Sequence, residues 1–395
     1  MIATAPTTKH ETRPGLRSGR VLLSCALFAL LALLAGATSQ APAQTLAGDG
    51  AKLHIVLAAP LSGRHAAIGL AQRAALDETI AKINASGGIA GRRVVLDAHD
   101  DGCDRIRAEA LARLVTTPPA PAPLAVIGHP CASAAEAAAP LYQQAGVVLL
   151  AAGNRYPGFT DHRAGPLVFR ISGRDDHQGL DAARRLRELA GKDGRIVMVQ
   201  DRTVMARAIT GAAARALMSQ VAGGAPPPPS IGIVAGETDY AKAVREVAAA
   251  RPSAILFAGF PAEAAILLRQ LRAAGIAAPL LMSDANATTE MAAHAGSLLD
   301  ASVEVLLPVP AFVTPGEPAD EPASAPEDIA TRDALSALDM IAVAAARAAN
   351  APSSAELATA LATSTENRSF DARGDAVTAS FAPHRRVDGA WRRVR

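Results

Sequence analysis

The segment His99–Asp104 gathers residue types that could bind a metal ion. It holds three carboxylates, on Asp100, Asp101 and Asp104, directly after a run of mainly apolar residues. Carboxylate oxygens are typical ligands of Ca²⁺ and Mg²⁺. The alternative is that Asp104 caps a following helix while the other acids are solvated. The nine histidines are scattered and form no His-Glu-x-x-His pattern, so we favour the alternative and expect no metal and no cofactor.

Two of the three cysteines, Cys103 and Cys131, could form a disulfide. The third, Cys25, lies in an apolar run near the N-terminus. If that run is removed on export, an even number of cysteines remains, which predicts one disulfide. Two buried free thiols and half of a metal site are the alternatives.

Motifs that carry catalysis are missing from the sequence. No Gly-x-Gly-x-x-Gly follows an expected strand, and neither a Walker A motif nor a Gly-x-Ser-x-Gly elbow is present. The glycine-rich segment 87–91 follows an expected helix and precedes a strand, which is the wrong order for a phosphate site and indicates a turn. We therefore expect a binding protein rather than an enzyme.

The charge balance makes nucleic acid an unexpected partner. The chain of 395 residues has a formal net charge of +2, but residues 1–43 contain four basic residues and one acid. The rest has 35 basic and 36 acidic residues, so no basic excess remains for phosphates. With half of its residues hydrophobic, the chain is expected to fold around a core and to bind a small molecule.

Residues 1–43 have the pattern of a secretory signal peptide. Arg17 and Arg20 precede the apolar run Val21–Ala37, and small residues at 41–43 offer a cleavage site, with an earlier cut after Ala37 as the alternative. The run could also just span a membrane. The small residues that follow the run favour cleavage, so we predict an exported chain.

Short apolar runs alternate with longer helical stretches from Leu53 onward, which predicts an α/β fold with parallel sheets. The first series of expected strands is Leu53–Ala59, Arg93–Ala98, Leu124–Gly128 and Val147–Ala152. The second is Arg195–Val199, Ser230–Val234, Ala254–Ala258, Pro279–Met282 and Val303–Leu307. Helices are expected at Gly69–Asn84, from Asp104 to about Leu114, and at Ala330–Ala349. Two such series predict two doubly wound lobes.

Other segments are expected to connect these elements. Pro226–Pro229 predicts a surface loop, and Pro308–Asp328 predicts an exposed connection. Arg170 and Asp175 are expected in a hinge or at the surface. The tail from Phe370 has a short strand-like pattern.

Seven segments, in order along the chain, carry a family resemblance. They are Ala59–Gly63, Ile83–Ile89, Asp100–Asp104, Val126–Cys131, Ala235–Tyr240, Leu268–Gly275 and Phe370–Asp375. On these segments the chain resembles the periplasmic leucine/isoleucine/valine-binding proteins, the solute receptors of branched-chain amino acid ABC importers. Cys103 and Cys131 fall where this family forms its disulfide.

The resemblance implies the type I periplasmic binding protein fold, with two doubly wound parallel-sheet lobes joined by a three-strand hinge. After a signal peptide at 1–43, the first lobe would comprise residues 50–171 and 309–369. The second would comprise residues 172–308 together with the C-terminal segment 370–395. Ligand would bind between the lobes, at the carboxyl ends of the strands, and a permease would detect their closure.

The resemblance also implies a set of ligand-binding positions. They are Ser62, Ile68, Ala132, Ser133, Gly153, Asn154, Arg155, Met205, Phe260 and Asp284. Where the family has two hydroxyl anchors, this chain has Ala132 and Arg155, so Arg155 is expected to grip a carboxylate in bidentate fashion. Asp284 is expected to hold an ammonium or a hydroxyl group.

Each of these assignments has a structural alternative. Arg155 could be solvated, and Asp284 could cap a helix. Ile68, Met205 and Phe260 are expected to form an apolar wall where the family often has tyrosines, although Met205 and Phe260 could simply belong to the core.

The predicted function is that of a periplasmic substrate-binding protein of an ABC importer. It would capture a branched-chain-like amino acid or a related small amphipathic carboxylate, without a reaction, and pass it to a permease in the inner membrane. A monomer is expected. The alternative is a sensor on the same scaffold that reports to a regulator or sensor kinase, and the third hypothesis, an exported α/β enzyme, lacks a recognisable nucleophile and base.

Overall fold

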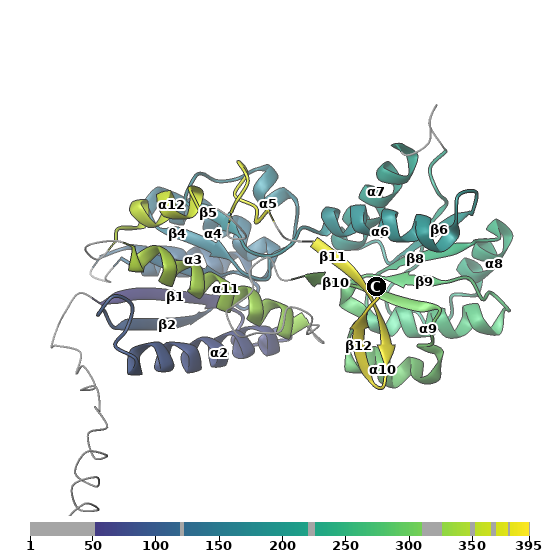
Figure 1. The fold of residues 1–395 in the computed structure, drawn as a ribbon, viewed down its shortest axis with the longest axis horizontal. Helices are drawn as coiled ribbons and strands as arrows, with labels where there is room; N and C mark the ends of the chain where they lie inside the picture. Colours follow the sequence, from purple (N-terminus) through teal and green to yellow (C-terminus); the bar gives the residue numbers. More distant parts are fainter. Residues whose placement is uncertain are drawn as a thin grey trace, which may run out of the picture. The chain divides into compact units, whose positions relative to one another are not determined.

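The computed structural model describes residues 52–118, 122–219, 226–309, 326–347, 352–364, 369–377 and 380–394. They form two α/β lobes, each built on one sheet (Figure 1). The predicted signal peptide and most of the connection after Pro308 lie outside the described residues. Within these ranges, no helix has the length and apolar character that a membrane crossing requires.

The first lobe contains a parallel sheet of five strands in the order β2-β1-β3-β4-β5. The strands are β1 Leu53–Ala59, β2 Val94–Asp100, β3 Ala125–Gly128, β4 Val148–Ala151 and β5 Val168–Arg170. One face is covered by α2 Ala66–Ala85, α11 Pro326–Ala346 and α12 Ser354–Ala362. The other is covered by α3 Arg105–Thr116, α4 Ala132–Ala145 and the short α5 Gly158–Asp161.

The second lobe contains a sheet of seven strands in the order β12-β11-β10-β9-β8-β6-β7. They are β6 Ile196–Gln200, β7 Ser230–Gly232, β8 Ala254–Ala258, β9 Leu280–Met282, β10 Val303–Val309, β11 Ser380–Val387 and β12 Ala390–Arg393. Strands β6 to β10 pair in parallel, whereas β11 and β12 form an antiparallel hairpin on β10.

Helices cover both faces of this second sheet. On one face lie α6 Asp175–Ala190 and α7 Val204–Ser219. On the other lie α8 Ala241–Ala250, α9 Pro261–Ala273 and α10 Thr289–Ala295. Two 3₁₀ turns, η1 Asp284–Asn286 and η2 Gly296–Leu298, flank α10.

Local sequence signals set several element ends as predicted. The Asp104 carboxylate accepts a hydrogen bond of 2.9 Å from the Arg107 N–H and caps α3. Gly87 and Gly88 have φ of +98° and +74°, which lets the chain turn after α2 at little cost. Residues 226–229 lie in the loop between α7 and β7, as expected from their prolines.

Strand β5 was not predicted, because it has only three residues and ends in an arginine. Arg170 is fully buried, and its Nη2 lies 2.6 Å from Asp375 Oδ1. The Arg170 backbone pairs with the segment Phe370–Ala376, whose Phe370 ring packs 4.8 Å from that of Phe169. The expectation of a surface position for Arg170 is therefore wrong.

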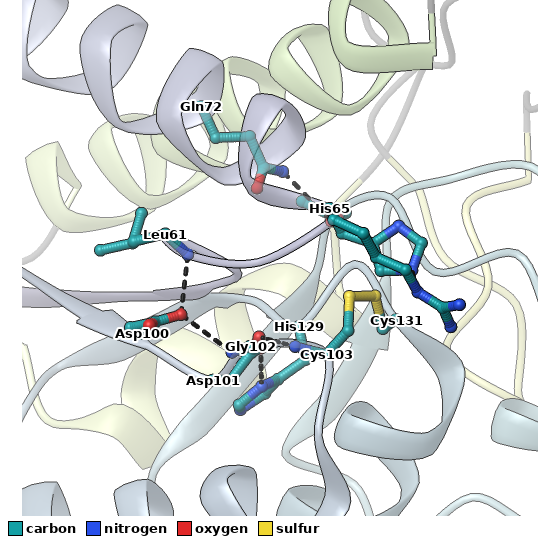
Figure 2. Close-up of a disulfide and its surroundings, with 11 residues drawn as sticks. Leu61, His65, Gln72, Asp100, Asp101, Gly102, Cys103, His129 and Cys131 are labelled. Carbon is teal, nitrogen blue, oxygen red and sulfur yellow. Dashed lines mark hydrogen bonds and ion pairs between the residues drawn. A yellow bond between two sulfur atoms is a disulfide. The ribbon is translucent and has the colours of Figure 1, made fainter.

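The predicted disulfide between Cys103 and Cys131 is confirmed, and it joins the loop after β2 to the start of α4 (Figure 2). The Cα atoms are 5.3 Å apart. Next to it, Asp101 Oδ2 lies 2.7 Å from Nδ1 of the buried His129. Asp100 accepts hydrogen bonds from the N–H groups of Leu61 and Gly102, at 2.8 and 2.9 Å.

The acidic segment 99–104 is thus structural, because all three of its aspartates bind other groups of the protein. In the part of the chain that the structure describes, no group of three His, Cys, Asp or Glu residues is arranged to hold a metal ion.

Reduction of the disulfide should destabilise the mature protein by roughly 3–4 kcal/mol, the loop-entropy estimate for a closed loop of about 29 residues. Urea unfolding with and without reductant would measure this difference. The double variant Cys103→Ser/Cys131→Ser serves as the control, since reductant should leave its unfolding midpoint unchanged. An equal response of both proteins would contradict the prediction.

Candidate functional site

Two predicted site residues from different lobes, Arg155 and Asp284, bind each other. Arg155 lies in the loop after β4, and Asp284 begins η1 after β9, so both follow the carboxyl end of a strand. The Arg155 Nη1 donates to Asp284 Oδ2. The side chains are only 15% and 5% exposed. Arg155 is therefore not a solvated loop residue, and the Asp284 carboxylate is held by side chains instead of capping a helix.

Arg155 is surrounded by carboxylates and by an aromatic ring. Its Nε lies 3.3 Å from Asp175 Oδ1, at the start of α6, and Asp333 on α11 adds a third negative charge nearby. Its guanidinium carbon lies 4.7 Å from the centre of the Phe381 ring. Burial disfavours the charge, but the attraction of Asp284 and Asp175 outweighs it and raises the pKa of Arg155. The guanidinium therefore stays charged.

The two other carboxylates titrate far above their ordinary range. Burial raises the pKa of Asp175 to about 6, although Arg155 opposes this shift. Burial also raises the pKa of Asp333 to about 6, against the Ser172 hydrogen bond and Arg155. Ser172 donates to Asp333 Oδ2 and accepts a hydrogen bond of 2.6 Å from the Gly153 N–H. The negative charge that Asp175 and Asp333 present to Arg155 therefore depends on pH, because it develops as the pH rises through a pKa of about 6.

Gln178 on α6 completes the surroundings of Asp284. Its Nε2 donates to Asp284 Oδ1 at 3.0 Å and to the Leu306 carbonyl at 3.1 Å. Its Oε1 is buried and has no hydrogen-bond partner. The Nε and Nη2 of Arg155 are buried without a hydrogen bond as well, although Nε is ion-paired to Asp175. One unused acceptor and two unused donors therefore lie at the Arg155–Asp284 pair, and such groups are rare in folded proteins.

A cavity beside Arg155 has both polar and apolar walls. Its polar wall contains Arg155, Ser172, Arg332 and Asp333, and its apolar wall contains Ile171, Val309 and Ile329. The loop that carries Arg155 is fixed by Gly153 and Asn154. Gly153 has φ of +99°, and the buried Asn154 accepts a hydrogen bond from the Tyr156 N–H at 3.1 Å.

The other predicted ligand-binding residues make different contacts. Ser62 is exposed and donates to Asp100 at 2.5 Å, and Ala132 and Ser133 begin α4. Met205 packs against the core under α6 and α7, which agrees with the core alternative for this residue. Phe260 is 47% exposed before α9 and is not a core residue, while Ile68 is partly buried on α2. Among the described contacts, none joins these six residues to Arg155 or Asp284.

Sequence reasoning missed Ser172, Gln178 and Asp333 as members of this site, and the expectation of a surface position for Asp175 is wrong, because this residue is buried beside Arg155. Ser172 and Gln178 follow the unrecognised strand β5, so their position relative to the sheet was not apparent. Asp333 could have been identified from the sequence, since it is an acidic residue in an alanine-rich helix that was expected to pack on the core.

Asp333→Asn should stabilise the protein by about 3 kcal/mol near pH 7, and this gain should disappear as the pH falls toward 4. The pKa of Asp333 is raised in the folded state, so the free energy of unfolding falls as pH rises between about 4 and 6. Asparagine mimics the protonated acid and removes this loss. Chemical unfolding of both proteins across this range would measure it, and a gain that is larger at pH 4 than at pH 7 would contradict the prediction.

Comparison with known proteins places the whole described chain in one family. The family model described as "Periplasmic binding protein" matches residues 52–394. An "Amino acid binding protein" of Pseudomonas aeruginosa is 31% identical over 243 residues, or 61% of this chain and 63% of that protein. The matched region thus spans less than two thirds of this relative.

Two further proteins show the same similarity. A "Leu/Ile/Val-binding protein" of Escherichia coli (strain K12) is 29% identical over 265 residues, or 67% of this chain and 70% of that protein. The branched-chain amino acid transporter substrate binding protein of Streptococcus pneumoniae, solved in complex with isoleucine, superposes with a TM-score of 0.65. It is 21% identical and covers 86% of this chain and 98% of its own, which shows the common fold.

Proposed function

The chain belongs to the periplasmic binding protein family, and from this premise we propose that it is an exported receptor for an amino acid or a related small amphipathic carboxylate. It would deliver this ligand to an ABC permease in the inner membrane. The observation that carries the proposal is the Arg155–Asp284 pair, which joins residues of both lobes. An amino acid offers a carboxylate and an ammonium to these same two groups.

The surroundings of the pair support an amphipathic ligand. Ile171, Val309 and Ile329 give the adjacent cavity an apolar wall beside Arg155 and Asp333. The similarity to proteins named for amino acid, leucine, isoleucine and valine binding supports the same class of ligand. The proposed role requires only binding and release, so no chemical step is assigned to any residue.

We divide the chain for this role into a signal peptide at 1–43, a first lobe at 50–171 and 309–369, and a second lobe at 172–308. The C-terminal strands from residue 380 belong with the second lobe. Pairing of Phe370–Ala376 with β5 supports assigning these seven residues to the first lobe. A ligand that contacts both lobes would favour their closed arrangement, which a permease can recognise.

A thermal-shift screen of the mature protein from residue 44 tests the proposed function. The panel contains leucine, isoleucine, valine, keto acids, aromatic carboxylates and polyamines. A ligand at 100 times its Kd should add about 2.7 kcal/mol of stability. A rise in melting temperature with a branched-chain amino acid supports the proposal. A rise with another carboxylate indicates that this carboxylate is the ligand instead. If no compound of the panel raises the melting temperature, the proposal is contradicted.

Asp284→Asn should weaken the binding of an ammonium-bearing ligand by about 2–5 kcal/mol, because a buried charged partner is lost. Isothermal titration with the best ligand of the screen would measure the change. Asp193→Asn is the matched control, since Asp193 is exposed in the turn before β6 and should leave the affinity unchanged. Equal affinity of the Asp284 variant and the wild type would remove Asp284 from the site.

A further inference from the structure

We propose that the Arg155–Asp284 pair is an internal competitor of the ligand, which binds by inserting between the two side chains. The ligand ammonium would replace Arg155 at Asp284, and the ligand carboxylate would replace Asp284 at Arg155. This inference rests on the proposed function, because it concerns the same site. It adds the requirement that one molecule carries both charges.

The occupancy of Asp284 is the first reason for insertion. Its Oδ2 accepts from Arg155 and its Oδ1 accepts from Gln178, and the side chain is 5% exposed. An ammonium group therefore reaches this carboxylate only by displacing Arg155. Separating the pair without replacement would leave the buried Asp284 carboxylate without a counter-charge and would remove one of the anions that Arg155 needs, which is strongly unfavourable.

The second reason is that Gln178 Oε1 and Arg155 Nη2 have no hydrogen-bond partner. Gln178 is fully buried, and its two hydrogen bonds as a donor fix which end of its amide carries Nε2. The Oε1 that remains can accept a hydrogen bond from a ligand ammonium bound at Asp284. On the other side, the Arg155 Nη2 can donate to a ligand carboxylate. A molecule with both groups would satisfy both atoms.

The charges that face Arg155 from other elements are the third reason. Asp175 at the start of α6 and Asp333 on α11 attract it in addition to Asp284, and Arg332 lies beside Asp333. A ligand with only a carboxylate would meet three aspartates and be repelled. A ligand with only an ammonium would leave Arg155 with Asp175 and Asp333. The expected order of affinity is zwitterion, then cation, then anion.

The test uses leucine and two compounds that each lack one of its charges. 3-Methylbutylamine lacks the carboxylate, and 4-methylpentanoate lacks the ammonium. Isothermal titration at pH 7.5 compares the wild type with Arg155→Gln and Asp284→Asn. We expect Arg155→Gln to bind 3-methylbutylamine at least about tenfold more tightly than the wild type, and Asp284→Asn to bind 4-methylpentanoate at least about tenfold more tightly. Both variants should bind leucine more weakly.

These gains distinguish competition from a structural role, because damage to the fold weakens every ligand. Arg185→Gln is the matched control: Arg185 is also ion-paired, to Glu304, and is 17% exposed. It should change none of the three affinities. If a single variant does not fold, the double variant Arg155→Gln/Asp284→Asn replaces it and should bind leucine no better than the two compounds with one charge.

The possible outcomes separate the two proposals. Leucine binding to the wild type without either gain would overturn insertion and leave the proposed function in place. Both gains without leucine binding to the wild type would support competition by the internal pair and contradict leucine as the ligand. A retained preference for leucine in the double variant would overturn insertion.

Discussion

The burial of the positive charge on Arg155 constrains the geometry of the whole site. A guanidinium that is mostly removed from water is costly unless anions and hydrogen-bond acceptors surround it. Asp284, Asp175 and Asp333 fulfil this condition from the end of β9, the start of α6 and the middle of α11. The loop after β4 and these three elements must therefore keep positions in which the carboxylates neutralise the charge of Arg155. Movement of any one of them would weaken this neutralisation.

The same physical rule governs a second cluster, next to the segment that leads from β5 to α6. Arg170 and Arg174 both contact Asp375, at 2.6 and 3.1 Å, and Arg174 also lies 2.9 Å from Asp161. Arg174 belongs to the linker itself, whereas Asp375 belongs to the segment before β11. These ion pairs attach both segments to the first lobe.

Much of the fold was predictable, because buried strands and helix ends have strong local signals. Strand β1 was predicted with its observed bounds, and Asp104 caps α3 as its type and position suggest. The loop that carries Arg155 and the strand end that carries Asp284 were both identified. The ion pair between them was not, because residue types at strand ends do not reveal which partners meet across two lobes. Ser62 shows the same difficulty, since its hydroxyl binds Asp100 of the neighbouring strand.

An arginine in place of a hydroxyl anchor changes the basis of recognition. A neutral hydroxyl contributes about 1 kcal/mol to binding and needs no counter-ion when the ligand is absent. Arg155 would be stronger as an anchor, but burial requires that anions surround it at all times, and in this chain Asp284, Asp175 and Asp333 do so. The free energy of binding then depends on how much more strongly the charged groups of the ligand interact with Arg155 and Asp284 than these two side chains interact with each other. If the ligand binds as proposed, this difference makes its charges, rather than the size of its apolar side chain, the basis of discrimination.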